Sequence, residues 1–235
     1  MKILAIDSSS LVASVAIITD DIMTAEYTVN FKKTHSQTLL PMIDEIVRMV
    51  GIEIDSIDAI AVSGGPGSFT GLRIGSATAK GIGLSLNKPI IHVPTIDAMA
   101  YNLFGTDKII CPIMDARRSQ VYTGLYTFKD GVLDIRKPQC AISMEELVEE
   151  LNSLKEDVIF IGDGIPVFCK YIDENLKNTH YYAPAHLNRQ RAGAVGALGM
   201  IYFKEGKYIS ADEHEPDYLR LSQAERCLNE KPSNE

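Results

Sequence analysis

The chain has 235 residues, and because 46% of them are hydrophobic it can bury one large core or two modest ones. Its formal net charge of -8 at pH 7 argues against a broad surface for nucleic acid, although a local basic site stays open. The four cysteines form no Cys-x-x-Cys pair, which argues against a zinc site and against a disulfide framework. They are Cys111, Cys140, Cys169 and Cys227. Residues 1–7 have the pattern of a strand interrupted by an aspartate, not of a signal peptide or anchor, so we expect a cytoplasmic protein that is not bound to a membrane.

The first half of the chain predicts an α/β unit that begins with an antiparallel meander. The predicted elements are strands over residues 2–6, 13–19 and 25–31, a helix over 36–50, a strand over 57–62, a helix over 70–86, a strand over 89–93 and a short helix over 95–103. Thr70 is the expected N-cap of the second helix. Pro41 lies beyond the first turn of the first helix, where its missing N–H is expected to cause a kink.

The second half repeats this order of elements, which indicates two similar lobes. It predicts strands over 109–114, 120–128 and 132–137, a helix that Ser143 and Glu146 begin with a capping box, a strand over 158–161, and helices over 165–176 and 191–204. A Gly-Thr-Asp stretch at 105–107 marks the seam. We therefore expect an N-terminal lobe over 1–104 with the dimerisation helices, a C-terminal lobe over 105–228 whose last segment can pack back on the first lobe, and a frayed tail over 229–235.

A glycine-rich turn over residues 64–67 joins a predicted strand to the helix that follows it. Its spacing matches neither Gly-x4-Gly-Lys-Ser/Thr nor the dinucleotide fingerprint, so a tight turn is favoured over a phosphate loop. Within the helix, Gly71, Gly75, Ala79 and Gly83 recur every four positions and share one side. Each glycine in a helix costs about 1 kcal/mol relative to alanine, so we expect this row to face outward and to be compensated by a closely packed partner helix. The rival interpretation is that the chain's own second lobe covers the row.

Asp7 and Asp115 each end a predicted strand, so they could face each other across a cleft between the lobes. Asp7 is followed by Ser8 and Ser9, and Asp115 is followed after one residue by Arg117 and Arg118. Two interpretations stay open, which are contact with a nucleotide or other anion, and satisfaction of backbone groups at strand ends. If the adjacent arginines lie in a strand, they point to opposite faces, and one binds an anion while the other is solvated.

Four stretches together resemble the TsaB (YeaZ) family. They are residues 63–75 with the core Gly-Pro-Gly-Ser-Phe-Thr-Gly-Leu-Arg, residues 115–122, residues 216–220 and, on the first helix, residues 35–41. The similarity spans residues 1 to about 226. It implies an α/β fold of the actin, hexokinase and Hsp70 (ASKHA) type, with two lobes that are each a mixed sheet flanked by helices.

The resemblance also implies a function. Members of this family are catalytically silent subunits in the formation of N6-threonylcarbamoyladenosine at position 37 of tRNA, paired with the transferase TsaD and the ATPase TsaE. We expect such a chain to form a homodimer when alone, with a monomer left open, and to meet tRNA only through the complex. The implied pairing surface lies on the first two helices, at His35, Leu39, Leu40, Ile43, Val47, Gly71, Leu72, Gly75, Ala79 and Gly83.

The same resemblance implies no cofactor and no metal of the chain's own. The transferase holds its metal with two histidines on one helix, and this chain has only His35 in the comparable segment. Binding of ADP or ATP at the interface with the partner stays open, with Asp7, Ser8, Ser9, Asp115, Arg117 and Arg118 as candidate contacts. Two enzyme classes remain as alternatives, an ATP-dependent small-molecule kinase of the same superfamily and a glycoprotease-like peptidase. A kinase would turn over ATP by itself, and a peptidase needs a nucleophile or metal that the sequence does not show.

Overall fold

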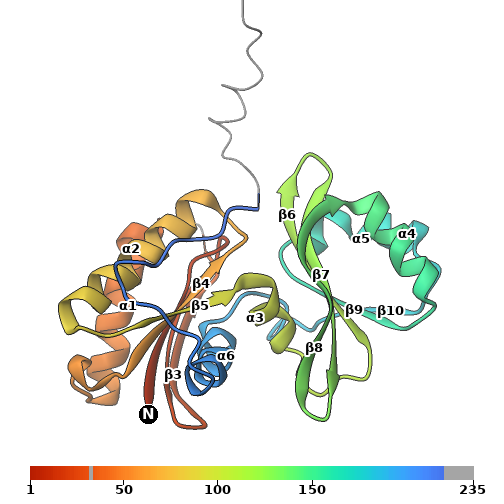
Figure 1. Ribbon diagram of the computed structural model, residues 1–235. Coiled ribbons are helices and arrows are strands. Elements are labelled where there is room, and N and C mark those ends of the chain that lie inside the picture. Colours follow the sequence, from red (N-terminus) through yellow and green to blue (C-terminus); the bar gives the residue numbers. More distant parts are fainter. Residues whose placement is uncertain (32–33, 220–235) are drawn as a thin grey trace, which may run out of the picture.

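The computed structural model describes residues 1–31 and 34–219, which form two lobes that each contain a five-stranded sheet (Figure 1). The tail expected over 229–235, together with Arg220 and Cys227, lies outside the described residues. Among the helices of the described ranges, none combines the length and the apolar character that a membrane span requires.

The first sheet is mixed and has the strand order β3-β2-β1-β4-β5. Its strands are β1 (Lys2–Asp7), β2 (Ala13–Thr19), β3 (Ile22–Val29), β4 (Ala59–Gly65) and β5 (Ile90–Pro94). The central strand β1 pairs antiparallel with β2 and parallel with β4. Because alternate residues of a strand point to opposite faces, Leu4 and Ile6 join one core, and Ile3 and Ala5 join another.

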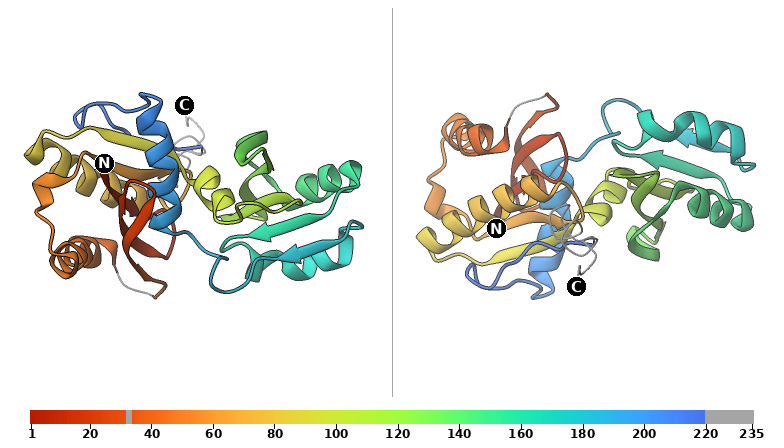
Figure 2. Two further views of the ribbon diagram at one scale, coloured as in Figure 1. Left: turned by 90° about the horizontal axis from the view of Figure 1, so that it is seen from below. Right: turned by 90° about the horizontal axis from the view of Figure 1, so that it is seen from above.

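Helices cover both faces of the first sheet (Figure 2). α1 (His35–Val50) and α2 (Phe69–Leu86) pack on one face, and α6 (Ala192–Lys204) packs on the other. The short 3-10 helix η1 (Ile54–Ser56) precedes β4. α6 lies close to the sheet, because Gly196 and Gly199 leave no room for a side chain against it; a Cβ built on Gly199 would lie 2.7 Å from the Cβ of Ala61. The chain therefore returns to the first lobe after it has completed the second sheet.

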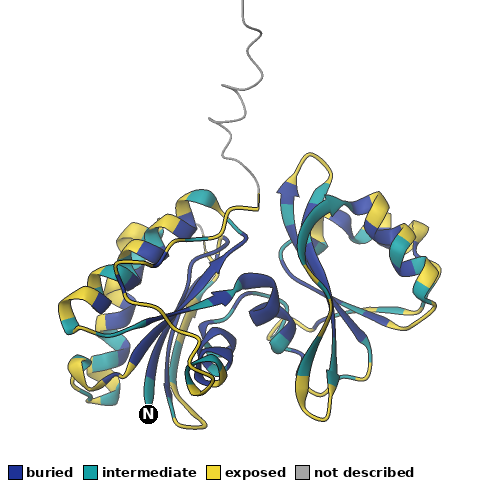
Figure 3. Cartoon of the chain, viewed as in Figure 1, coloured by how far each residue is buried: buried dark blue, intermediate teal, exposed yellow. Residues whose placement is uncertain are grey.

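The second sheet repeats the topology of the first, with the order β10-β9-β6-β7-β8. Its strands are β6 (Ile109–Arg117), β7 (Gln120–Lys129), β8 (Val132–Ser143), β9 (Val158–Ile161) and β10 (His180–Tyr182). α4 (Met144–Leu154) and α5 (Ile165–Asn175) pack on it, and α3 (Thr95–Tyr101) contacts both sheets. Figure 3 shows buried strands and helices whose outer faces are exposed. The expected echo between the two halves is thus confirmed as two sheets of the same strand order.

The predicted fold class is confirmed, since both lobes are mixed sheets flanked by helices. The lobe limits of 1–104 and 105–228 stay a prediction, and α6 is the part of the later range that packs on the first sheet. The predicted capping box of Ser143 and Glu146 is present. Thr70 was the wrong N-cap for α2, because Ser68 takes this role and its hydroxyl accepts a hydrogen bond from the Gly71 N–H. Pro41 lies inside α1, and the kink stays a prediction.

Candidate functional site

The glycine-rich turn after β4 is a place where three segments meet with no room for side chains. A Cβ on Gly64 would overlap the ring of His92, one on Gly65 would overlap the backbone of Asp217, and one on Gly67 would lie 2.9 Å from the Cβ of Ser9. The Asp217 N–H donates to the Gly64 carbonyl at 2.6 Å. Glycine is therefore required here by close backbone approach, which agrees with the tight-turn interpretation.

The row of small residues on α2 faces inward, which corrects the expected outward orientation. A Cβ on Gly71 or on Gly75 would overlap Ser8, and one on Gly83 would lie 2.8 Å from the Cβ of Ala211. Ala79 is fully buried in the core under α1 and α2. The compensating contact is therefore the chain's own β1–β2 turn, together with the segment after α6. Helical spacing shows which residues share a side, and here that side packs against the first lobe itself.

The remaining candidates for the pairing surface divide into buried and exposed residues. Leu39, Ile43 and Leu72 are each at most 5% exposed and belong to the packing of the first lobe, so their placement on an outward surface is wrong. Leu40 is 57% exposed, whereas His35 and Val47 are half-buried. His35 Nε2 donates to the Ser10 carbonyl at 2.7 Å, which ties the start of α1 to the β1–β2 turn.

Asp7 is buried beneath the β1–β2 turn and is used within it. Its Oδ1 accepts hydrogen bonds from the Ser9 N–H at 2.9 Å and from the Ser9 hydroxyl at 2.7 Å. Burial raises the pKa of Asp7 to about 6, although the hydrogen bonds from Ser9 oppose this shift. The Ser8 hydroxyl donates to the Gly71 carbonyl at 2.8 Å. These side chains thus satisfy groups of the chain itself.

The same contacts decide how a phosphate group would fit at this turn. A phosphate site here would need free backbone N–H groups. The Ser9 N–H is bonded to Asp7, the Ser68 N–H donates to the Ser9 carbonyl at 2.6 Å, and the Gly71 N–H is capped by Ser68. These three N–H groups are therefore engaged within the chain and are not available to a phosphate.

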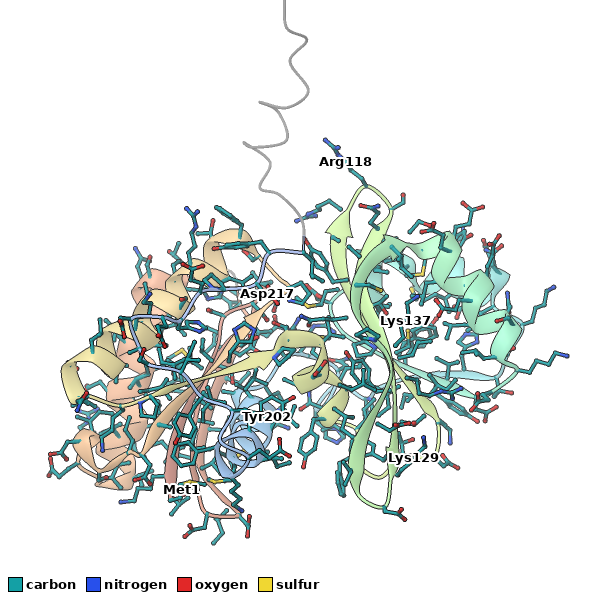
Figure 4. The ribbon with its side chains drawn as sticks, viewed as in Figure 1. Met1, Arg118, Lys129, Lys137, Tyr202 and Asp217 are labelled. Carbon is teal, nitrogen blue, oxygen red and sulfur yellow. The ribbon has the colours of Figure 1, made fainter. Side chains whose placement is uncertain are left out.

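A cleft of about 630 Å³ lies between the two lobes. Of the candidate anion contacts, Ser9, Asp115 and Arg117 line it, whereas Asp7 and Ser8 lie beneath its wall and Arg118 lies at the tip of the β6–β7 hairpin (Figure 4). The two aspartates therefore do not face each other across the cleft. His35, a candidate for the pairing surface, also lines the cleft. The other lining residues were not candidates for anion contact: Ser10, Leu11, Pro66, Gly67, Ser68, Phe69, Thr70, Met114, Ala116, Tyr122, Asp163, Asp217, Tyr218 and Leu219.

Asp163 is the lining residue that the sequence could have indicated. It directly follows β9 in a Gly-Asp-Gly turn, and ligands of α/β sheets bind beyond the carboxyl ends of parallel strands. Burial raises the pKa of its carboxyl group, and the negative charge of Asp115 raises it further. Its Oδ1 is buried without a hydrogen-bond partner among the described residues. The second lobe thus presents two carboxyl groups to the cleft.

The segment over residues 209–219, which we term the C-terminal strap, completes the cleft wall. Ile209 forms a β-bridge with Ile90, Lys80 donates to the carbonyls of Asp212 and His214, and the ring of Tyr218 lies 4.9 Å from that of Phe69. The strap thereby holds the C-terminal part of the chain against α2 and β5. It also brings Asp217, Tyr218 and Leu219 to the cleft, so residues far apart in the sequence form one wall.

Comparisons with known proteins show the family. Residues 26–227 match the family TsaD: tRNA N6-adenosine threonylcarbamoyltransferase. The protein named tRNA threonylcarbamoyladenosine biosynthesis protein TsaB from Bacillus subtilis is 35% identical over 225 residues, which cover 96% of each chain. Its namesake from Escherichia coli is 30% identical and covers 97% of this chain and 98% of its own. The chain belongs to the TsaB family.

Solved structures show the same fold. YeaZ from Pseudomonas aeruginosa superposes with a TM-score of 0.80 at 24% identity, over 93% of this chain and 99% of its own. An inorganic polyphosphate/ATP-glucomannokinase from Arthrobacter superposes with a TM-score of 0.50 at 12% identity, over 87% of this chain and 99% of its own. The two-lobed ASKHA fold is thus confirmed for this member of the TsaB family.

The stretches that resemble TsaB proteins meet at one place in the structure. Parts of residues 63–75, parts of residues 115–122 and residues 217–219 line the interlobe cleft, and so does His35 at the start of the fourth stretch. The stretches that carry the resemblance to TsaB proteins are therefore brought together at the cleft. Within residues 1–31 and 34–219, no group of three or more His, Cys, Asp or Glu side chains is placed to hold a metal ion.

Proposed function

We propose that this chain takes part in forming N6-threonylcarbamoyladenosine at position 37 of tRNA, as a non-catalytic subunit that pairs with the transferase TsaD and the ATPase TsaE. The observation that carries the proposal is the convergence of the TsaB-like stretches on one cleft, in a chain that is similar to TsaB proteins over nearly its whole length. The cytoplasm is the compartment in which such a subunit would work.

The geometry of the β1–β2 turn supports a non-catalytic role. Asp7 and Ser9 are hydrogen-bonded to each other, and Ser8 is bonded to α2. A catalytic carboxylate has to reach a substrate or a metal-bound phosphate, whereas Asp7 is only 1% exposed. If ADP or ATP binds, we place it at the interface with the partner, because Asp7, Ser8 and Ser9 form their hydrogen bonds within this chain.

The outer faces of α1 and α2 supply the pairing surface of this proposal. The two helices lie side by side on the first sheet, and they expose Leu40, Met49 and Leu84 by 57%, 76% and 59%. Ala77 and Gly81 on α2 are also exposed, and a Cβ on Gly81 would meet nothing within 4 Å. This outward pair of small residues lets a partner helix approach closely, which is the role first expected of the inward row. A second copy of the chain would use the same face in a homodimer.

Charge substitution on this face tests the pairing. We expect Leu84→Glu combined with Ala77→Glu to abolish co-purification with TsaD and self-association, because both charges would be buried unpaired in the interface. Thermal stability should stay within a few degrees of the wild type, since both residues are exposed in the single chain. Glu substitutions at Val167 and Tyr171, which are exposed on α5, serve as the control. Unchanged pairing of the Leu84→Glu/Ala77→Glu variant would contradict the assignment of this surface. In a separate assay, ATP turnover by the chain alone would favour the kinase alternative.

A further inference from the structure

The turn between β6 and β7 breaks the usual rule for tight turns. Three consecutive residues, Arg117, Arg118 and Ser119, adopt left-handed backbone conformations with φ of 66°, 55° and 57°. Such a turn between antiparallel strands favours Asn-Gly or Asp-Gly, because other residues pay about 1 to 2 kcal/mol each in this region. None of the three residues is Gly, Asn or Asp.

The same sheet contains a turn that follows the rule. Between β7 and β8, Asp130 and Gly131 adopt φ of 51° and 78° with the residue types that suit them. The two turns lie at opposite ends of β7. The residues at one end suit a left-handed backbone, and those at the other end do not. Backbone strain of this kind persists where the surrounding structure holds it, and it gathers at functional positions.

Specific contacts hold the strained turn in place. Asp115 Oδ1 accepts from the Arg117 N–H at 2.8 Å, and its Oδ2 pairs with Arg117 Nη1 at 3.2 Å. The Ser119 carbonyl accepts from the N–H of Met144, the first residue of α4, at 3.0 Å. The structure thus fixes the backbone of the tip by its flanks while leaving the guanidinium groups outside.

Both arginine side chains are exposed to a partner, although the Arg117 guanidinium also pairs with Asp115. The Arg117 side chain is 86% exposed, and that of Arg118 forms no hydrogen bond or ion pair with any described residue. Figure 4 shows Arg118 projecting from the end of the hairpin, beyond the body of the second lobe. In a chain of net charge -8, Arg117 at the cleft wall and Arg118 at the adjoining hairpin tip form a local cationic site. At physiological ionic strength, the repulsion between the acidic body and an anion is largely screened beyond about 8 Å. The exposed tip can therefore still bind an anion.

We propose that the β6–β7 tip, with Arg117 and Arg118, binds phosphate groups of the tRNA in the assembled complex. This inference rests on the proposed function, which supplies the polyanion. Arginine suits the role because its planar guanidinium pairs with two phosphate oxygens at once and stays charged at every physiological pH. Asp115 is then a positioning residue, which orients Arg117 and holds the turn. The negative charge of the body opposes RNA binding by the chain alone, and the tip is the part of the chain that we expect to touch the RNA.

The test compares two hairpin ends of the same sheet. The complex of this chain with TsaD is titrated with an unmodified tRNA transcript that carries adenosine at position 37, at several salt concentrations. Arg118→Ala should weaken binding by roughly tenfold at 0.1 M salt and lower the slope of log K against log salt by about 1, as expected for one lost phosphate contact. Lys129→Ala, which removes one charge at the β7–β8 end, should leave both values unchanged (Figure 4).

A second variant separates the side chain from the fold. Arg118→Asn with Ser119→Gly gives the turn the residues that its conformation favours, so we expect the melting temperature to rise by roughly 2 to 6 °C. The same variant should lose tRNA affinity as Arg118→Ala does. A variant that is more stable yet binds RNA less tightly cannot be explained by misfolding.

Three outcomes would overturn the assignment. The first is that Arg118→Ala and Lys129→Ala weaken tRNA binding equally. The second is that the variant with Arg118→Asn and Ser119→Gly keeps full affinity for tRNA. The third is that Arg118→Ala abolishes the complex with TsaD and not tRNA binding, which would assign the tip to an acidic protein surface. The chain alone is titrated in parallel with its Arg118→Ala variant. If the chain does not pair with TsaD, but the wild-type chain and its Arg118→Ala variant still differ in salt-dependent RNA binding, the proposed subunit role fails and the tip assignment stands.

Discussion

Ser8 and Gly71 are in direct backbone contact. The Ser8 hydroxyl donates to the Gly71 carbonyl at 2.8 Å, and a Cβ on Gly71 would lie 3.3 Å from the Ser8 carbonyl carbon while overlapping its oxygen. This contact seats the first turn of α2 on the turn between β1 and β2. This proximity fixes α2 so that the helix presents Ala77 and Gly81 outward.

The contact predicts opposite effects for two glycines of one helix. Gly71→Ala should destabilise the chain by about 1 to 3 kcal/mol, because the methyl group meets backbone that cannot move away, and should lower the melting temperature by roughly 2 to 10 °C. Gly81→Ala should stabilise it by up to about 1 kcal/mol, because alanine is the better helix former and the site is open. Thermal denaturation of both variants decides. A Gly71→Ala protein that melts like the wild type but no longer pairs would restore the outward interpretation of the row.

Burial of Asp7 predicts a dependence of stability on pH. The pKa of this carboxyl group is about 6 in the folded chain against an ordinary 3.8, so the folded state binds the proton more tightly. The resulting stabilisation is complete below about pH 4 and is lost as the pH rises through 6. Asp7→Asn keeps the oxygen that accepts from Ser9 but cannot ionise. Relative to the wild type, its free energy of unfolding should therefore rise by about 2 to 3 kcal/mol between pH 4 and pH 7.

Urea denaturation at several pH values between 4 and 7 measures this difference. All other ionisable groups are common to both proteins, so their contributions cancel to first order. Parallel stability curves for the wild type and Asp7→Asn would show that Asp7 is not buried as an isolated carboxyl group.

A hydrogen bond across the lobes predicts a second stability effect. The Tyr126 hydroxyl on β7 donates to Asp97 Oδ1 on α3 at 2.7 Å, and both residues are at most 5% exposed. Burial raises the pKa of Asp97, and the tyrosine is its partner. Tyr126→Phe removes only the donor and leaves the carboxyl group unsatisfied, which should cost about 1 to 3 kcal/mol. Tyr27→Phe, at an exposed position on β3, is the matched control. A double-mutant cycle with Asp97→Ala, which removes the acceptor, should give a clear coupling energy, and a value near zero would refute the interaction.

Much of the fold followed from local patterns. Alternation in residues 13–19 and 120–128 and helical spacing in 36–50 depend only on neighbouring residues, and they predicted β2, β7 and α1 closely. Ser143 and Glu146 likewise interact within one helical turn. β10 was not predicted, because its three residues carry too little pattern, and the β6–β7 turn lacks the glycine or asparagine that marks such turns.

The candidate site was predicted less well, because it depends on contacts between distant segments. The spacing of Gly71 and Gly75 shows that they share a side, but only the position of Ser8, more than sixty residues earlier, decides that this side is internal. In the same way Asp217 reaches the glycine turn only because α6 carries the chain back to the first sheet. The resemblance located the stretches that matter, and the structure showed that they form one cleft.

The central claim is that this chain enables tRNA modification without performing it. The most direct test is formation of N6-threonylcarbamoyladenosine at position 37, measured with unmodified tRNA, an activated threonylcarbamoyl donor, and purified TsaD and TsaE, in the presence and in the absence of this chain. We predict no modification by the chain alone, full modification by the three proteins together, and loss of activity when Leu84→Glu/Ala77→Glu replaces the wild type. Modification at the same rate by TsaD and TsaE without the chain, or by the chain without TsaD, would contradict the account.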